Sequence, residues 1–437
     1  MNTVDYFKER FDQLQSANGN TALGTVRRDA FDRFSKMGIP TVKHEEWKYT
    51  RIGGLFNKEY QYAVNPIITS LSAADINSVR LPGYEQANEL VFVNGVFSLP
   101  LSVIRSAELV VLPLEEAAKN EFKEIVSKHF GHSSNYLKDG INALNTALAN
   151  GGIFLHIRRG QIAERPVYIY NITDTRSSNI LAQPRSLVHI GENAQVQIVE
   201  TYATVGSGES FTNQVMEVVT EKDAVLAYYK IQNDAGHTNQ VSTTHIRQIG
   251  KSYVHAVTVS LNGGIVRNNL NVVLEAERCE AHLYGLYFQQ GKGHVDNHTV
   301  VDNVKPYCLS NELYKGILSD SATGVFNGKI FVRPLAQKTN AYQSNKNILL
   351  SDAASVNTKP QLEIFAVDVK CSHGCTVGRL NEEGLFYLRS RGIDEKTARS
   401  LLLRAFVVDI LEHIKPEPIR TYVDNLIAQR LELDIPC

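Results

Sequence analysis

The chain has 437 residues, of which 43% are hydrophobic and 21% charged, and its net charge is −1. This length exceeds one ordinary core and predicts two or three domains of a soluble globular protein. The balanced charge argues against binding to DNA or to an anionic membrane through bulk positive charge. We therefore expect neither nucleic-acid nor membrane partners.

Signals for export and for disulfide bonding are weak. No apolar run approaches the roughly 20 residues of a membrane helix, and the polar opening MNTVDYFKERFDQLQ lacks the apolar segment of a secretory signal. Five cysteines, an odd number, do not predict a disulfide framework. Cys279, Cys308 and Cys437 stand alone in the sequence, and we expect plain thiols there. These features predict a cytoplasmic protein.

Helical periodicity opens the chain. Phe7, Phe11 and Leu14 fall on one face of a first helix. A second helix is expected to end at Gly38. The helices and the hairpin described next predict a mainly helical N-terminal domain over residues 1–150.

Two further features lie within this first domain. The only tryptophan, Trp47, lies in HEEWKYT, and we expect it to anchor a core or a subdomain. NELVFVNGVFSLP alternates apolar residues around Asn94 and Gly95. This pair favours a type I′ turn and predicts a β-hairpin.

Short segments rich in β-branched and aromatic residues recur from Ile153 to about Cys371. Polar or Gly/Asn corners separate them every ~8–12 residues, which is typical of an all-β sandwich, barrel or solenoid. No crisp sequence repeat is visible, so periodicity alone leaves these three architectures open. We assign residues 151–375 to this β core.

The stretch GVFNGKI within the core resembles a phosphate-binding loop only superficially. The distance from Gly324 to Lys329 is one residue short of the Walker motif, and Ile330 occupies the hydroxyl position. We therefore expect no ATPase activity from this chain. Asn327 and Gly328 are expected to form a tight turn between two strands.

Residues 376–437 predict a C-terminal helical domain. Asp394 is the expected N-cap of a long helix, and Pro416 and Pro418 end its pattern. This helix carries a broad apolar stripe: Ala398, Leu401, Leu402, Ala405, Val407 and Val408. Such a stripe either buries against the chain's own core or docks a partner.

The densest cluster of metal-binding residue types is VKCSHGCTVG. In a strand, Cys371 and His373 would share a face about 6.5 Å apart, and Gly374 is expected to break the strand before Cys375. A closed zinc site needs four ligands, and this stretch supplies at most three. Metal chemistry and a strand-end packing cluster both remain open.

A second polar cluster is GHVDNHT, where His294, Asp296 and His298 would share one strand face. We favour a hydrogen-bonded polar row on a sheet over a ligand set, because buried polar groups are usually satisfied in this way.

Several long stretches together resemble the SufB/SufD family of iron–sulfur cluster assembly proteins. They are ELYKGILSDSATGVFNGKIFV, AQKTNAYQSNKNILLSD, PQLEIFAVDVKCSHGCTVGRL and EEGLFYLRSRGI, with EEWKYT near the N-terminus. The motifs KCSHG and EEWKYT resemble those of the SufD branch of the family. The resemblance implies a right-handed parallel β-helix core, flanked by N-terminal and C-terminal helical domains.

The resemblance also implies a non-enzymatic subunit of a cytosolic complex with SufB-like and SufC-like chains. The SufC-like chain supplies ATP hydrolysis, and the complex builds nascent iron–sulfur clusters. Cys371 and His373 are then expected at the interface with SufB, where they contact iron transiently, without a tightly bound cofactor. The SufC docking residues are expected in the C-terminal helices: Leu401, Leu402, Ala405 and Phe406. Cys375 departs from the family, which usually has alanine there.

Other interpretations remain. Alone, the chain is expected to form a homodimer through the edge that otherwise meets SufB. One alternative is a SufB-like paralogue. Another is a polysaccharide-acting enzyme on a β-helix, which would use groove residues such as Asp296, Asp302 and Arg333; the lack of a secretory signal argues against it.

Overall fold

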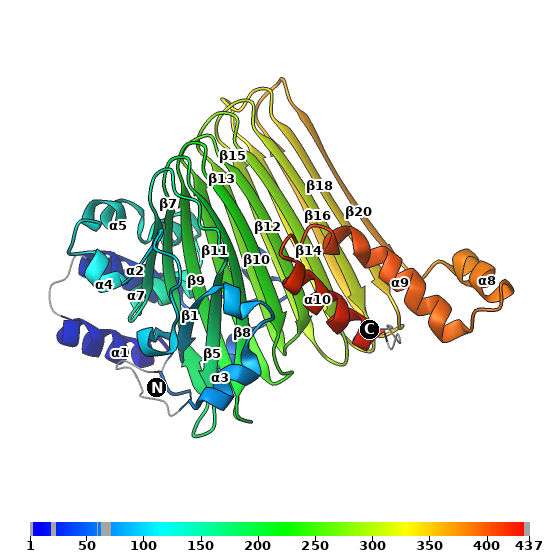
Figure 1. The fold of residues 1–437 in the computed structure, drawn as a ribbon, viewed down its shortest axis with the longest axis horizontal. Coiled ribbons are helices and arrows are strands. Elements are labelled where there is room, and N and C mark those ends of the chain that lie inside the picture. The colour runs from blue at the N-terminus through cyan, green and yellow to red at the C-terminus, as the bar shows by residue number, and fades with distance from the viewer. Residues whose placement is uncertain (1–2, 19–22, 59, 63–70, 432–437) are drawn as a thin grey trace.

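The computed structural model describes residues 3–18, 23–58, 60–62 and 71–431. Its body is a parallel β-solenoid, in which the chain winds repeatedly through two long sheets that face each other (Figure 1). Helices flank this body at the start and at the end of the described chain. The structure therefore confirms the mainly β core with N-terminal and C-terminal helices, and it selects the solenoid over the sandwich and the barrel.

Sheet B is parallel apart from the β1–β2 hairpin. In spatial order its strands are β2 (Val96–Phe97), β1 (Asn88–Val93), β5 (Val167–Asp174), β8 (Gln195–Val205), β10 (Val225–Asn233), β12 (Tyr253–Asn262), β14 (Glu280–Gln289), β16 (Leu309–Leu318), β18 (Asn340–Leu349) and β20 (Lys370–Gly378). The hairpin turns at Asn94 and Gly95, whose φ angles are 51° and 86°. This confirms the predicted hairpin and its type of turn.

Sheet A faces sheet B across the core and is parallel apart from its first pair, β3–β4. In spatial order its strands are β19 (Ser355–Ile364), β17 (Thr323–Val332), β15 (His294–Asn303), β13 (Ile265–Leu274), β11 (Thr238–Gln248), β9 (Ser210–Thr220), β7 (Arg185–Ile190), β4 (Ile153–Ile157) and β3 (Leu109–Pro113). The short β6 (Ile180–Ala182) pairs with β9.

Strands of successive turns stack in register, so that equivalent positions form columns through the solenoid. Val254, Ala281, Ser310 and Ala341 make one such column in sheet B, and all four are buried. Because side chains alternate along a strand, every second residue faces the interior between the sheets. This alternation produces one continuous apolar core from the first turn to the last.

The corners between the sheets repeat in backbone conformation. Asn193, Asp223, Arg278, Tyr307 and Lys338 each adopt a positive φ between 56° and 62°. Each donates its backbone N–H to a carbonyl of the following turn. Since these five equivalent residues are of five different types, the solenoid has no visible sequence repeat.

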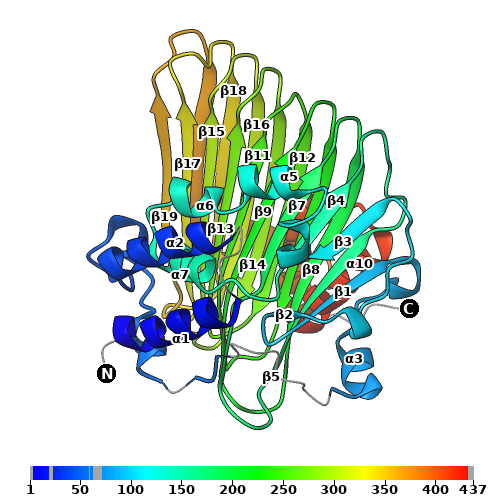
Figure 2. The ribbon, with the colours of Figure 1, turned by 90° about the vertical axis from the view of Figure 1, so that its left-hand side faces the viewer.

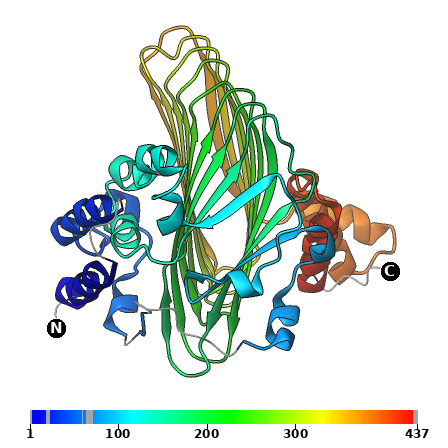
Figure 3. The same cartoon turned by 60° about the vertical axis from the view of Figure 1, so that its left-hand side comes forward.

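Most of the N-terminal helices cover the outer face of sheet A (Figures 2 and 3). The helices of this region are α1 (Thr3–Asn18), α2 (Gly24–Met37), α3 (Ala73–Val79), α4 (Leu114–Ala117), α5 (Lys123–His129), α6 (His132–Tyr136) and α7 (Gly140–Ala147), with 3-10 turns η1 (Glu45–Trp47), η2 (Gly53–Asn57), η3 (Tyr84–Gln86) and η4 (Leu99–Leu101). Phe7, Phe11 and Leu14 are buried on one face of α1, and Gly38 caps α2, as predicted. Helix α3 instead packs on the side of sheet B.

The C-terminal helices are α8 (Glu382–Ser390), α9 (Glu395–Leu411) and α10 (Glu417–Arg430). Helices α9 and α10 pack on the outer face of sheet B, across the solenoid from α1 and α2 (Figure 3). Asp394 caps α9 by accepting a hydrogen bond from the Thr397 N–H at 3.0 Å, as predicted. No helix within the described ranges is long and apolar enough to cross a membrane. Residues 432–437, including Cys437, lie outside the described residues.

The expectation of a turn at Asn327 and Gly328 is wrong, because both lie in the middle of β17. A β-carbon on Gly328 would stand 2.3 Å from Nε2 of Gln343 and 2.7 Å from Cζ of Phe326. The glycine is needed for close side-chain approach inside the solenoid rather than for a turn.

Histidines line the contact between the N-terminal helices and sheet A. His129 of α5 and His132 of α6 face His156, His189 and His245 on the outer face of the sheet. Nδ1 of His189 lies 3.1 Å from Nδ1 of His156, and Nδ1 of His132 lies 2.8 Å from Nε2 of His245. Burial lowers the pKa of His189 to about 4 and that of His129 to about 3. These rings are therefore neutral at pH 7.

We predict that acid weakens this contact. The pKa of His189 is lower in the folded chain than in the unfolded chain, so its stabilising effect is complete above pH 6.5 and is lost as the pH falls toward 4. Between pH 7.5 and pH 5, the free energy of unfolding of His189→Gln should therefore fall by about 1–2 kcal/mol less than that of the parent. Urea unfolding at pH 7.5 and pH 5 measures the difference. The matched control is His237→Gln, in an exposed loop; an equal effect in both variants would contradict the prediction.

Candidate functional site

The last turn of the solenoid leaves a strand edge open in each sheet. Among the described strands, β20 pairs only with β18, and β19 pairs only with β17. Almost all of β20 is exposed, whereas the strands of the preceding turns are mostly buried. The backbone N–H and C=O groups along the free edges of β20 and β19 are therefore available to another strand.

The cysteines and histidine of VKCSHGCTVG lie on β20. Cys371 and His373 pair in register with Ala341 and Gln343, which are buried on the inner face of β18. They therefore share the inner face of the last turn, and Cys371 packs partly against the apolar core. The strand continues through Gly374 to Gly378, so the expected break before Cys375 is wrong. Nothing lies within 4 Å of the β-carbon position of Gly374, so the strand has room for a side chain there.

This arrangement does not hold a metal by itself. Since Cys371, His373 and Cys375 occupy alternate positions, they spread along the strand at about 6.5 Å per step. Within the described residues, no group of three or more His, Cys, Asp or Glu side chains is arranged to hold a metal ion. Burial also raises the pKa of the Cys371 thiol, which favours the protonated form over the thiolate that binds metals.

The four residues expected to dock a partner divide into two groups. Leu401 and Ala405 are exposed on α9, in line with the exposed Val408. Leu402 and Phe406 are half-buried and pack against the core under the helix. The exposed members form an apolar stripe at the spacing of one helix face.

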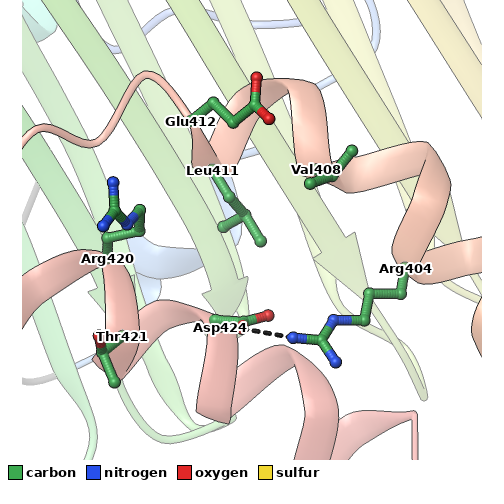
Figure 4. A pocket seen from close by; sticks show the side chains of 7 residues that line it. All are labelled: Arg404, Val408, Leu411, Glu412, Arg420, Thr421 and Asp424. Carbon is green, nitrogen blue, oxygen red and sulfur yellow. Dashed lines mark hydrogen bonds and ion pairs between the residues drawn. The ribbon is translucent and has the colours of Figure 1, made fainter. Parts of the chain in front are cut away.

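The C-terminal helices have two further surface features. Helix α8 projects from the body (Figure 1) and exposes 76% of Phe386 and 57% of Tyr387. A hollow between α9 and α10 has Val408 on its rim and is crossed by the ion pair of Arg404 and Asp424 at 2.7 Å (Figure 4). Exposed aromatic and aliphatic side chains of this kind are typical of a protein-binding surface.

The HVDNH row is a hydrogen-bonded polar row, as favoured from the sequence. Asp296 is buried and accepts a hydrogen bond from Arg267 at 2.7 Å, and Nε2 of His298 lies 3.0 Å from its other carboxylate oxygen. Burial alone would raise the pKa of Asp296, but His298 and Arg267 hold it below its ordinary value. Nε2 of His294 lies 2.8 Å from the Thr50 hydroxyl. The row is therefore occupied by protein partners.

The EEWKYT segment closes over this row. Trp47 stacks on the Arg267 guanidinium at 3.8 Å, and its ring N–H donates to Asp139 at 3.1 Å. The hydrogen bond to His298 lowers the pKa of Glu46 to about 2, and Lys329 adds an ion pair at 2.6 Å. Trp47 is thus the predicted anchor. Its partner Arg267 lies 220 positions further along the chain and had no sequence signal.

The residues named for a polysaccharide-acting enzyme do not form an open carboxylate groove. Asp302 is 2% exposed and binds Arg333 and the Tyr136 hydroxyl, each at 2.8 Å. Asp296 is covered by Thr50 and Arg267. Both carboxylates are therefore parts of interfaces between the N-terminal region and sheet A.

The fold is a β-solenoid with an unpaired edge at its last turn and with flanking helices, and comparisons with known proteins identify its family. Residues 172–406 match the family model described as SUF system FeS cluster assembly, SufBD core domain. Residues 2–169 match the SufBD protein N-terminal region. The chain belongs to the SufBD family of iron–sulfur cluster assembly proteins.

Similar proteins span most of the chain. An iron–sulfur cluster assembly SufBD family protein of Synechocystis is 31% identical, covering 92% of this chain and 89% of its own. The iron–sulfur cluster assembly protein SufD of Escherichia coli is 30% identical, covering 91% and 90%. Protein ABCI7, chloroplastic, of Arabidopsis thaliana is 33% identical, covering 94% and 86%.

We predict that Arg267→Met destabilises the chain by about 3–5 kcal/mol, because it removes the buried guanidinium from the Asp296 carboxylate, leaves His298 as the ion-pair partner of that carboxylate, and removes the ring contact of Trp47. Urea unfolding followed by tryptophan fluorescence, which reports Trp47 directly, measures the change. The control is Arg379→Met, which removes an exposed ion pair with Asp352 and should change stability by less than about 1 kcal/mol. Similar losses in the two variants would refute the assignment.

Proposed function

We propose that this chain is a SufD-type, non-catalytic subunit of a complex with a SufB-like chain and a SufC-like ATPase, which together build nascent iron–sulfur clusters. The observation that carries the proposal is the unpaired β20 edge with His373 on its inner face. The similarity to the protein named SufD in Escherichia coli supports the type of subunit.

The open end suits a second solenoid. A strand of a SufB-like chain that adds to β20 satisfies the free backbone groups and extends the core. It also brings donors from another chain to Cys371 and His373. Imidazole and thiolate both suit iron, so an incomplete set of ligands becomes complete only in the complex. Iron and sulfide are then substrates held transiently, and no cofactor stays tightly bound.

Binding of iron by Cys371 releases a proton. Because burial raises the pKa of the Cys371 thiol, the bond to iron forms as the thiol loses its proton. A cation arriving at the interface lowers that pKa and drives the loss. Cys371 therefore stays a thiol until partner and metal are both present.

The C-terminal helices suit the ATPase partner. Leu401, Ala405 and Val408 form an exposed stripe on α9, and α8 separately exposes Phe386 and Tyr387. Leu402 and Phe406 support the stripe from below. In the absence of a SufB-like chain, two copies of this chain pair through the β20 edge. We place the complex in the cytoplasm, although one relative is named chloroplastic.

Co-expression of the tagged chain with SufB-like and SufC-like proteins tests the complex, and the mass of the purified assembly is the measurement. The parent chain should bring down both partners. Leu401→Asp should lose the SufC-like chain at least tenfold, since a charge on the stripe opposes burial. The control is Leu335→Asp, an equally drastic change at a residue 69% exposed on a solenoid corner. Retention of the ATPase by Leu401→Asp would disprove docking through α9.

A second experiment addresses His373. His373→Ala should leave the three-chain complex intact, because the backbone edge of β20 and not this side chain pairs with the partner strand, and should reduce cluster formation at least tenfold. The absorbance of clusters formed from iron and sulfide on the purified complex measures the yield, and His237→Ala serves as an exposed histidine control. Unchanged yield in His373→Ala would remove the imidazole from the chemistry.

A further inference from the structure

Behind His373, a row of polar side chains crosses the inner face of the last turns of sheet B. Glu312 of β16 pairs in register with Gln343 of β18, and Gln343 pairs in register with His373 of β20. Neighbouring strands are about 4.8 Å apart, so side chains at these three positions stand side by side and point the same way. The row leads from the buried interior to the open end.

The two inner members are joined by a hydrogen bond with a defined direction. Gln343 donates from Nε2 to Oε2 of Glu312 at 2.7 Å, and the two residues are 3% and 2% exposed. Since the amide nitrogen is used on the side of Glu312, the amide oxygen is left for the opposite side, where His373 lies. Oε1 of Gln343 is buried and has no hydrogen-bond partner among the described residues.

The opposite sheet leaves room for this amide. A β-carbon on Gly328 of β17 would stand 2.3 Å from Nε2 of Gln343. Any other residue at that position would displace the amide from Glu312. Burial also raises the pKa of Glu312 to about 7, which is the cost of holding a carboxyl inside the core. Glu312 places a carboxyl group at a position that is otherwise apolar, and Gly328 makes room for its partner Gln343. This combination indicates that the polar pair has a function.

We propose that Glu312 and Gln343 are positioning residues for the His373 imidazole. Glu312 fixes the amide so that its unpaired oxygen, Oε1 of Gln343, is left for His373. When the exposed His373 ring turns toward the row, that oxygen accepts a hydrogen bond from one ring nitrogen. The other ring nitrogen is then an unprotonated acceptor directed away from the row, ready to bind a metal. Metal-binding histidines are commonly held in this way by an acceptor on the second nitrogen. The inference rests on the proposed role of His373.

The test uses the full chain labelled with ¹⁵N-histidine, with the His373 signal assigned by its loss in His373→Ala. In the parent, the ring nitrogen shifts should report one dominant tautomer. Gln343→Leu removes the acceptor and should give a mixture of tautomers at His373. Gln214→Leu is the matched control, because Gln214 is another buried glutamine on the inner face of the solenoid, on β9. An unchanged tautomer in Gln343→Leu overturns the proposal.

Two further variants separate positioning from general damage. Glu312→Leu leaves the amide free to turn and should mix the tautomers in part, whereas Glu312→Gln keeps an acceptor and should restore the parent signal. With the partner chains present, Gln343→Leu should lower cluster yield about 10-fold or more without loss of the complex. If His373→Ala leaves the yield unchanged, the proposed function fails, yet the tautomer signal still decides whether the row holds the ring.

Discussion

The fold depends on one constraint, which is the in-register stacking of parallel strands. Each strand satisfies its backbone N–H and C=O groups with the turn before it and the turn after it. The same rule that orders the interior leaves the last turn with nothing beyond it. β19 and β20 therefore combine regular geometry with an open edge. The free edge at this end therefore needs no special element, because the stack of strands ends there.

The N-terminal region is held to the solenoid by charge as well as by apolar packing. Arg267, Asp296 and His298 satisfy one another on the outer face of sheet A, and Trp47 covers the guanidinium. A buried ion pair contributes little net stability when intact, but removing one partner leaves an unpaired charge. The cluster therefore specifies where the EEWKYT segment docks. Histidines kept neutral by burial line the rest of this contact and make it sensitive to acid.

The strands, the helix faces and the hairpin followed from local patterns, because alternation and capping are short-range effects. The choice of a solenoid came from family resemblance. Periodicity could not supply it, since Asp223, Arg278 and Tyr307 share a corner conformation and no chemistry. Gly328 was misread as a turn residue because its neighbour Gln343 comes from the facing sheet. The partner of Trp47 escaped prediction for the same reason, since Arg267 comes from a strand far along the chain.

The two surfaces proposed for partners, the β20 edge and the C-terminal helices, are directly connected in the structure. β20 ends at Gly378 and α8 begins at Glu382, so only three residues separate the open edge from the projecting helix. Helix α9 is also tied to the sheet, because Lys315 of β16 donates to the Phe406 carbonyl at 2.7 Å and to Asp409 at 2.5 Å. The inner face of that same strand carries Glu312. The proposed docking helix and the row that ends at His373 therefore share one strand, β16, whose outer face contacts α9 and whose inner face carries Glu312.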